Sequence, residues 1–175
     1  MEQMWLDFLY VIPAAIPPHK VVNNPISAEH RLEMCRLAFL EMEGVYVSDM
    51  EIQRGGKSYT VDTLRELTAE DRRLFLLCGT DMMLTLNQWY CPDEIFRLCY
   101  PVYIRREKDA TLDAQIVQKI ADYQTQYGKV VRRIVTEPLV ISSSMVRERL
   151  QKGSDVTDLI PPAVEKYIAD NHLYV

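Results

Sequence analysis

The sequence predicts an α/β fold, a doubly wound and mostly parallel sheet within a single domain. Three observations support this prediction. Short apolar runs alternate along the chain with segments of helical periodicity. Pro, Gly or charged residues bound the apolar runs, and polar side chains follow where several of them end. In such folds ligands bind beyond the carboxyl ends of the strands, so we expect the functional residues there.

Five segments are predicted as strands of this sheet. Three of them are almost wholly apolar, which is typical of parallel strands buried on both faces. The fifth carries Arg132 and Arg133, which favours an edge position. The predicted strands are residues 8–12, 74–78 and 102–104, which are the apolar three, with 45–47 and 130–135.

The first predicted helix begins after Ser27, a residue type that caps helix starts. In this segment Leu32, Cys35, Phe39 and Met42 recur with helical spacing, so they are expected to share one face of the helix.

Three more helices are marked by their terminal residues. Thr60 and Thr111 are each predicted to cap the helix that follows. Gly128 is predicted to stop the helix that Thr111 starts. Pro92, which follows Cys91, fits the first position of another helix. Helices therefore separate the predicted strands, as a parallel sheet requires.

Composition and charge exclude several classes of protein. The chain has 175 residues, of which 48% are apolar and 26% charged, which indicates one compact domain rather than a disordered or fibrous chain. A net charge of −5 argues against nucleic acid as a partner. No apolar stretch approaches membrane-spanning length, and the first residues lack the features of a secretion signal. We expect a cytoplasmic protein without a membrane partner, and a homo-oligomer stays open.

The cysteines and histidines do not indicate a metal site. Cys35, Cys78, Cys91 and Cys99 lack C-x-x-C spacing, and the three histidines lie far apart in the sequence. We expect buried, reduced thiols and no metal ion bound by protein ligands alone.

Two segments carry groups suited to an anionic ligand. A proline-rich loop presents His19 and Lys20 together, and its restricted backbone suits phosphate binding. Thr60 and Asp62 lie at a helix start, whose free N–H groups can bind a carboxylate or a phosphate. Taken singly, a solvated loop and an ordinary capped helix explain these segments better.

The segment after residues 74–78 is suited to a nucleoside. Gly79 permits close approach of a ligand, and Asp81 can accept hydrogen bonds from ribose hydroxyls. Trp89, further along, could stack on a heteroaromatic ring, although a partly buried core tryptophan is the commoner case.

A run of three serines is suited to a polyphosphate. Their hydroxyls and N–H groups lie at a predicted helix start, and Arg147 follows one turn later to neutralise charge. A serine-capped helix with its arginine in solvent is the structural alternative. The three residues are Ser142, Ser143 and Ser144.

In the order and spacing of its motifs, the chain resembles the bacterial nicotinate mononucleotide adenylyltransferases from about Trp5 to Tyr174. The motifs are PPHK, SYTVDTL, GTD followed by LxxW, ISSSMVRERL and LIPPAVEKYIADNHLY. The resemblance implies transfer of the adenylyl group of ATP to the phosphate of nicotinate mononucleotide, which yields nicotinate adenine dinucleotide and pyrophosphate. It also implies Mg²⁺ on the polyphosphate and direct attack without a covalent enzyme intermediate.

Matching motif positions imply roles for residues of the first half of the chain. The nicotinate ring and its carboxylate would be held by Thr60, Asp62, Trp89 and the backbone N–H of Tyr90. Gly79 and Asp81 would hold the adenylate ribose.

The same matching implies contacts with adenine and the phosphates. Ser142, Ser143, Ser144 and Arg147 would provide them, and Ser144 stands where the family usually has Thr. His19, on the substrate side, and Lys20 would lie beside the phosphate path. Lys20 and Arg147 are the predicted catalytic residues.

The chain departs from the family at its start. Family members open with a strand, a Gly-rich turn and a His-x-Gly-His motif, to which neither His19 nor His30 corresponds. We therefore expect Met1 to be an internal residue of a longer polypeptide. One alternative is a non-catalytic protein that keeps only the mononucleotide pocket. Another is pantetheine-phosphate or cytidylyl transfer on the same fold, which SYTVDTL and Trp89 suit less well.

Overall fold

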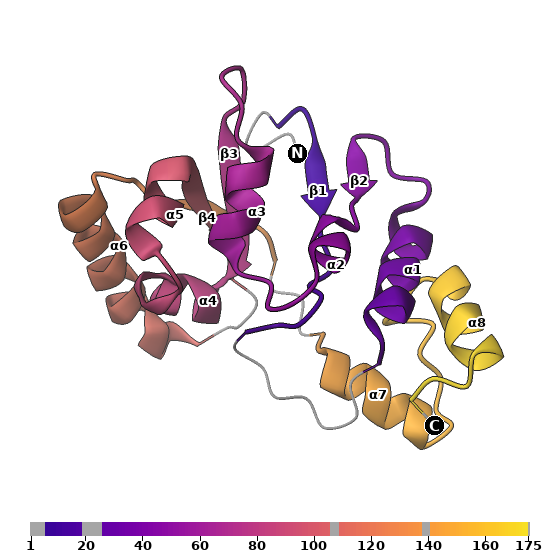
Figure 1. Cartoon of the computed structure of the whole chain (residues 1–175). Coiled ribbons are helices and arrows are strands. Elements are labelled where there is room, and N and C mark those ends of the chain that lie inside the picture. Colours follow the sequence, from indigo (N-terminus) through magenta and orange to yellow (C-terminus); the bar gives the residue numbers. More distant parts are fainter. Residues whose placement is uncertain (1–5, 19–25, 106–108, 138–140, 175) are drawn as a thin grey trace. The chain divides into compact units, whose positions relative to one another are not determined.

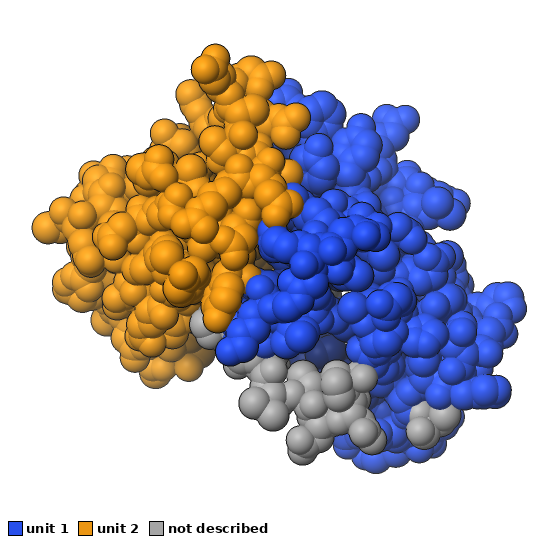
Figure 2. All heavy atoms as spheres, in the orientation of Figure 1, with its two compact units in different colours: residues 1–58, 141–175 blue, residues 59–140 orange. Residues whose placement is uncertain are grey.

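The computed structural model describes residues 6–18, 26–105, 109–137 and 141–174 (Figure 1). The chain divides into two compact units (Figure 2). Unit 1 comprises Met1–Ser58 and Ile141–Val175, and unit 2 comprises Tyr59–Val140. The expectations of a single domain and of an upstream segment stay predictions.

Unit 1 is built on two parallel strands joined through a helix. Leu9 of the first strand pairs with Val45 of the second. The intervening helix starts where predicted, because the Ser27 hydroxyl accepts a hydrogen bond from the His30 N–H at 3.3 Å. The elements are β1 (Leu9–Val11), α1 (Ala28–Phe39), β2 (Val45–Val47), α2 (Met50–Arg54), α7 (Ser143–Gln151) and α8 (Pro162–Asp170).

Helices α1 and α8 pack against each other in unit 1. Val164 and Ile168 of α8 are buried in a small apolar cluster to which Met34 and Leu37 of α1 contribute. His30 Nδ1 lies 2.9 Å from the hydroxyl of Tyr167, so this histidine bonds α1 to α8.

Unit 2 contains a parallel sheet in the order β3-β4-β5. Strand β5 lies at the edge with Arg132 and Arg133 exposed, which confirms the edge prediction. The elements are α3 (Thr60–Leu67), β3 (Leu74–Gly79), α4 (Thr80–Thr85), the 3₁₀ turn η2 (Leu86–Gln88), α5 (Pro92–Leu98), β4 (Cys99–Ile104), the 3₁₀ turn η3 (Ala110–Leu112), α6 (Asp113–Tyr127) and β5 (Arg132–Ile134).

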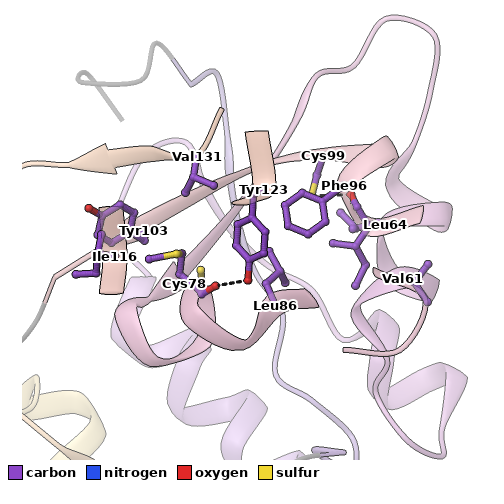
Figure 3. Packing of buried hydrophobic residues seen from close by; sticks show 12 residues of the cluster. Val61, Leu64, Cys78, Leu86, Phe96, Cys99, Tyr103, Ile116, Tyr123 and Val131 are labelled. Atoms are coloured by element: carbon purple, nitrogen blue, oxygen red, sulfur yellow. Dashed lines mark hydrogen bonds between the residues drawn. The ribbon is translucent and has the colours of Figure 1, made fainter. Parts of the chain in front are cut away.

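The core of unit 2 surrounds Tyr123 of α6 (Figure 3). Its ring packs against Phe96 of α5 with centroids 4.7 Å apart. Its hydroxyl donates a hydrogen bond to the Met83 carbonyl at 2.9 Å and accepts one from the Asn87 N–H at 3.3 Å. Burial raises the pKa of Tyr123, so the hydroxyl stays protonated as a donor. The side chain thereby ties α6 to α4 and η2.

The burial predicted for the apolar strands is correct only in part. Strand β4 is largely buried and begins at Cys99, ahead of the predicted residues 102–104. In β1 and β3, however, Tyr10 and Leu77 are exposed. An apolar run alone cannot show which face a helix covers, because the pattern is the same for one covered face or two.

Three predicted helix details are wrong. Met42 is exposed because α1 already ends at Phe39. Thr60 is the first residue of α3 rather than its cap, a position that Tyr59 occupies. Thr111 lies within η3, which Asp109 caps by accepting a hydrogen bond from the Thr111 N–H at 2.9 Å, and Leu112 occupies the N-cap position of α6.

The other helix ends agree with the sequence. Pro92 is the first residue of α5, and Gly128 ends α6 in the left-handed conformation, at φ 64°. Among the described residues, no helix combines the length and apolar character needed to cross a membrane.

All four cysteines lie in described segments and are free thiols. Cys78 and Cys99 are buried, and burial raises the pKa of each to about 12. Cys35 and Cys91 are only half-buried, so the prediction of buried thiols is correct for two of the four.

The Tyr123 hydroxyl provides a test of the unit 2 core. Tyr123→Phe should lower the free energy of unfolding by about 0.5–1.5 kcal/mol, because the Met83 carbonyl and the Asn87 N–H each lose a hydrogen bond to the hydroxyl. Tyr127→Phe, which leaves the Tyr123 hydroxyl bonds in place, is the matched control. Urea unfolding of both variants measures the difference, and equal stabilities would contradict the anchoring role.

Candidate functional site

The first turn of α3 presents two of the predicted residues, Thr60 and Asp62. Both are half-buried, and they lie at the helix end where backbone N–H groups lack intrahelical partners. The Asp62 carboxylate accepts a hydrogen bond from Arg65 Nη1 at 2.7 Å. Asp62 is therefore already engaged by a cation of its own helix.

The segment between η2 and α5 presents Trp89 and Tyr90. Trp89 is half-buried and packs against the unit 2 core, while the Tyr90 side chain is exposed. Cys91 then adopts the left-handed conformation, at φ 53°, and turns the chain into α5. This conformation is uncommon for a residue other than glycine, so the turn is held by its surroundings.

These two segments meet in unit 2. The rings of Tyr59 and Tyr90 lie with centroids 4.6 Å apart, and α3 contacts α5. Val61 of α3 and Trp89 belong to the same core cluster. The structure thus brings together the two segments that carry the four residues predicted for the pyridine ring, here called the α3/α5 cluster: Thr60, Asp62, Trp89 and Tyr90.

An ion-pair network that the sequence analysis missed also joins α3 to α5. Arg65 of α3 donates hydrogen bonds to both carboxylate oxygens of Glu94 in α5, and the Nε–Oε1 distance is 3.2 Å. Arg97 Nη2 reaches Glu94 Oε1 at 3.0 Å. The hydrogen bonds from Arg65 hold the pKa of Glu94 below its ordinary value. The i,i+3 spacing of Asp62 and Arg65 could have predicted their ion pair from the sequence. Nothing in the sequence indicated that Glu94 bonds Arg65.

The end of β3 carries the residues predicted for the ribose. Gly79 is the last residue of the strand and the N-cap of α4. Thr80 is 2% exposed, so its side chain belongs to the packed interior, whereas Asp81 is exposed in the first turn of α4. Asp81 is therefore the polar side chain of this turn that a ligand can reach.

The α7 cluster, Ser142, Ser143, Ser144 and Arg147, lies in unit 1. Ser142 caps α7, since its hydroxyl accepts a hydrogen bond from the Met145 N–H at 3.2 Å, as in the structural alternative of a serine-capped helix. All three serines are exposed.

Arg147 differs from the two cations that follow it in α7 and at its C-cap. Arg149 and Lys152 form ion pairs at 2.6 Å with Asp158 and Glu148. Arg147 Nη2 instead donates to the Ser144 hydroxyl at 3.2 Å, back toward the helix start. A hydroxyl neutralises no charge, so this guanidinium is suited to receive an anion at the start of α7.

His19 and Lys20 lie outside the described residues.

The sequence analysis did not single out Tyr174, whose pKa is affected by the positive charge of Arg147. Burial raises the pKa of Tyr174, and Arg147 and Arg31 lower it in part.

The chain is similar to known proteins over nearly all of its length. A family model described as cytidylyltransferase-like matches residues 1–149. A probable nicotinate-nucleotide adenylyltransferase of Synechococcus sp. (strain JA-2-3B'a(2-13)) is 36% identical, over 99% of this chain and 87% of the relative. A protein of the same name from Geobacter sp. (strain M21) is 39% identical, over 97% and 85%.

The fold has a solved counterpart. The structure of Plasmodium falciparum nicotinic acid mononucleotide adenylyltransferase complexed with NaAD matches with a TM-score of 0.71 and 20% identity, covering 97% of this chain and 83% of that chain. This likeness establishes the Rossmann-like nucleotidyltransferase fold, and the relatives establish the family. The chain belongs to the cytidylyltransferase-like family and, within it, to the nicotinate-nucleotide adenylyltransferases.

Proposed function

We propose that the protein transfers the adenylyl group of ATP to the phosphate of nicotinate mononucleotide, in NAD biosynthesis. Family membership supports the reaction. The observation that supports this substrate is the α3/α5 cluster, in which residues from two separate segments meet around the Tyr59–Tyr90 contact. A helix start with free donors beside a half-buried tryptophan suits a flat ring that bears a carboxylate.

In this proposal the α3/α5 cluster holds the pyridine ring. The Thr60 hydroxyl and the Tyr90 N–H donate hydrogen bonds to the nicotinate carboxylate, and Trp89 stacks on the ring. Asp62 contributes through its bond to Arg65. Gly79 and Asp81, at the end of β3, bind the adenylate ribose.

The reaction is a direct displacement at phosphorus. A phosphate oxygen of the mononucleotide attacks the α-phosphorus of ATP, and the bond from that phosphorus to the bridging oxygen breaks, releasing pyrophosphate. The protein positions the reactants and stabilises negative charge. We assign this to the α7 cluster, with Arg147 and Lys20 as catalytic cations and His19 beside the mononucleotide phosphate.

Mg²⁺ fits this arrangement as an ion carried by ATP. Among the described residues, His, Cys, Asp and Glu form no group of three that could hold a metal. Mg²⁺ at phosphate-transfer sites is commonly bound through substrate phosphates with few protein ligands, and exposed hydroxyls are present at the start of α7. When bound, Mg²⁺ offsets phosphate charge.

We further propose that the protein works in the cytoplasm on small-molecule substrates.

The reaction is tested by incubating the protein with ATP, Mg²⁺ and nicotinate mononucleotide and separating the products by chromatography. We expect nicotinate adenine dinucleotide and pyrophosphate in equal amounts, and less product when CTP replaces ATP. Calorimetric binding of the mononucleotide without any dinucleotide formed would instead support a non-catalytic nucleotide-binding protein.

Trp89 provides a test of the pyridine contact. Trp89→Ala should weaken mononucleotide binding by about two- to tenfold, because ring stacking contributes about 0.5–1.5 kcal/mol beyond burial. ATP affinity should stay unchanged. Tyr100→Ala, at the start of β4, is the aromatic control. Calorimetric titration measures the affinity for each ligand. Equal losses of affinity for the mononucleotide and ATP would assign Trp89 to the core alone.

Arg147 provides a test of the phosphate contact. Arg147→Ala should lower kcat with ATP by about tenfold or more, because a charge-assisted bond to the transferring phosphates is lost. Mononucleotide affinity should change little. The control is Arg149→Ala, on the same helix but paired with Asp158. Steady-state kinetics measure both, and a rate equal to that of the control would refute the assignment.

A further inference from the structure

We propose that Arg65 is a positioning residue for the mononucleotide, because its guanidinium fixes the position of the first turn of α3 relative to the first turn of α5. The inference rests on the proposed pyridine contacts of the α3/α5 cluster. Arg65 itself lies outside that cluster and acts through the two carboxylates that it bonds, Asp62 and Glu94.

All three nitrogen atoms of the Arg65 guanidinium donate hydrogen bonds. Nη1 donates to Asp62 Oδ1 at 2.7 Å, Nε donates to Glu94 Oε1 at 3.2 Å, and Nη2 donates to Glu94 Oε2. Three separate N–H groups thus bind carboxylates of two helices. Arginine presents these donors in a fixed plane, which lysine cannot imitate with its single ammonium group.

Both carboxylates lie close in sequence to the proposed ligand contacts. Asp62 is in the same helical turn as Thr60, whose hydroxyl is proposed to bind the nicotinate carboxylate. Glu94 is in the first turn of α5, which begins directly after the Tyr90-Cys91 segment. A shift of either turn would therefore change the distance between the Thr60 hydroxyl and the Tyr90 N–H.

The segment before α5 needs such a restraint. Cys91 adopts positive φ, and the Tyr90 side chain is exposed, contacting Tyr59 at its ring. Backbone conformations of this kind persist when the surroundings fix them. The bidentate Arg65–Glu94 pair supplies a fixed point one turn away, and the Tyr59–Tyr90 contact supplies a second.

The solvent exposure of the Arg65–Glu94 ion pair indicates that losing it should affect ligand binding more than global stability. The side chains of Arg65 and Glu94 are 47% and 25% exposed, and such ion pairs contribute little to global stability. Misplacement of ligand-binding groups, in contrast, is costly for binding and turnover. We therefore expect Arg65 variants to fold normally and to lose mononucleotide affinity.

The experiment compares Arg65→Met with Arg97→Met. Arg97 bonds the same Glu94 carboxylate but belongs to α5 itself and has no link to α3 among the described contacts. Arg65→Met should raise the KM and the calorimetric Kd for nicotinate mononucleotide by about five- to tenfold. The KM for ATP should stay constant, and Tm should fall by less than about 4 °C. Arg97→Met should match the wild type.

A double-mutant cycle separates positioning from general disturbance. If Arg65 acts through Glu94, adding Arg65→Met to Glu94→Gln should raise the Kd less than Arg65→Met does alone. Arg65→Lys should restore only part of the affinity, because one ammonium cannot hold both carboxylates. If Arg65→Met does not fold, Arg65→Gln takes its place.

Three results would overturn the proposal: an Arg65→Met effect equal to that of Arg97→Met, equal losses for both substrates, or full additivity with Glu94→Gln. Trp89→Ala in the same titration shows which inference has failed. A mononucleotide-selective loss in Trp89→Ala with none in Arg65→Met refutes Arg65 alone. Selectivity in neither variant refutes the pyridine contacts, and the positioning role with them.

Discussion

The architecture of unit 2 depends on one buried hydroxyl. Tyr123 reaches from α6 to the Met83 carbonyl and the Asn87 N–H, and so fixes α4 and η2 against α6. That short stretch of chain runs from Gly79 at the end of β3 to Trp89. The proposed ribose and pyridine contacts therefore lie at the two ends of a segment that a single side chain anchors. Rigid support of this kind is what a binding site requires of its scaffold.

In this acidic chain, attraction of anions depends on individual cationic and N–H groups. With a net charge of −5, the protein must attract anions through individual donors rather than through its overall field. Arg149 of α7 and Lys152 at its C-cap are bound by carboxylates, and Arg147 by a hydroxyl. In unit 2, Arg65 is bound to carboxylates. In the roles we propose, the same residue type serves charge recognition in one unit and restraint of two helices in the other, according to its neighbours.

At two positions the structure is compatible with both roles that the sequence presented as alternatives. Ser142 is a true cap of α7, and the serines after it remain exposed. Trp89 packs against the core and is still half-buried rather than enclosed. Structural and ligand-binding roles are compatible in both cases, because one face of the residue supports the fold and the other can meet a ligand.

The sequence by itself determined the alternation of strands and helices, the edge position of β5, the Ser27, Ser142 and Gly128 boundaries, and the family. These features depend on residue type and short spacing, which local physics translates directly. Only the tertiary structure decided that Tyr59 occupies the N-cap position of α3, that Tyr10 and Leu77 are exposed in their strands, and that Glu94 bonds Arg65. Such features depend on which segments meet in space, and Arg65 and Glu94 are separated by the whole of β3, α4 and η2.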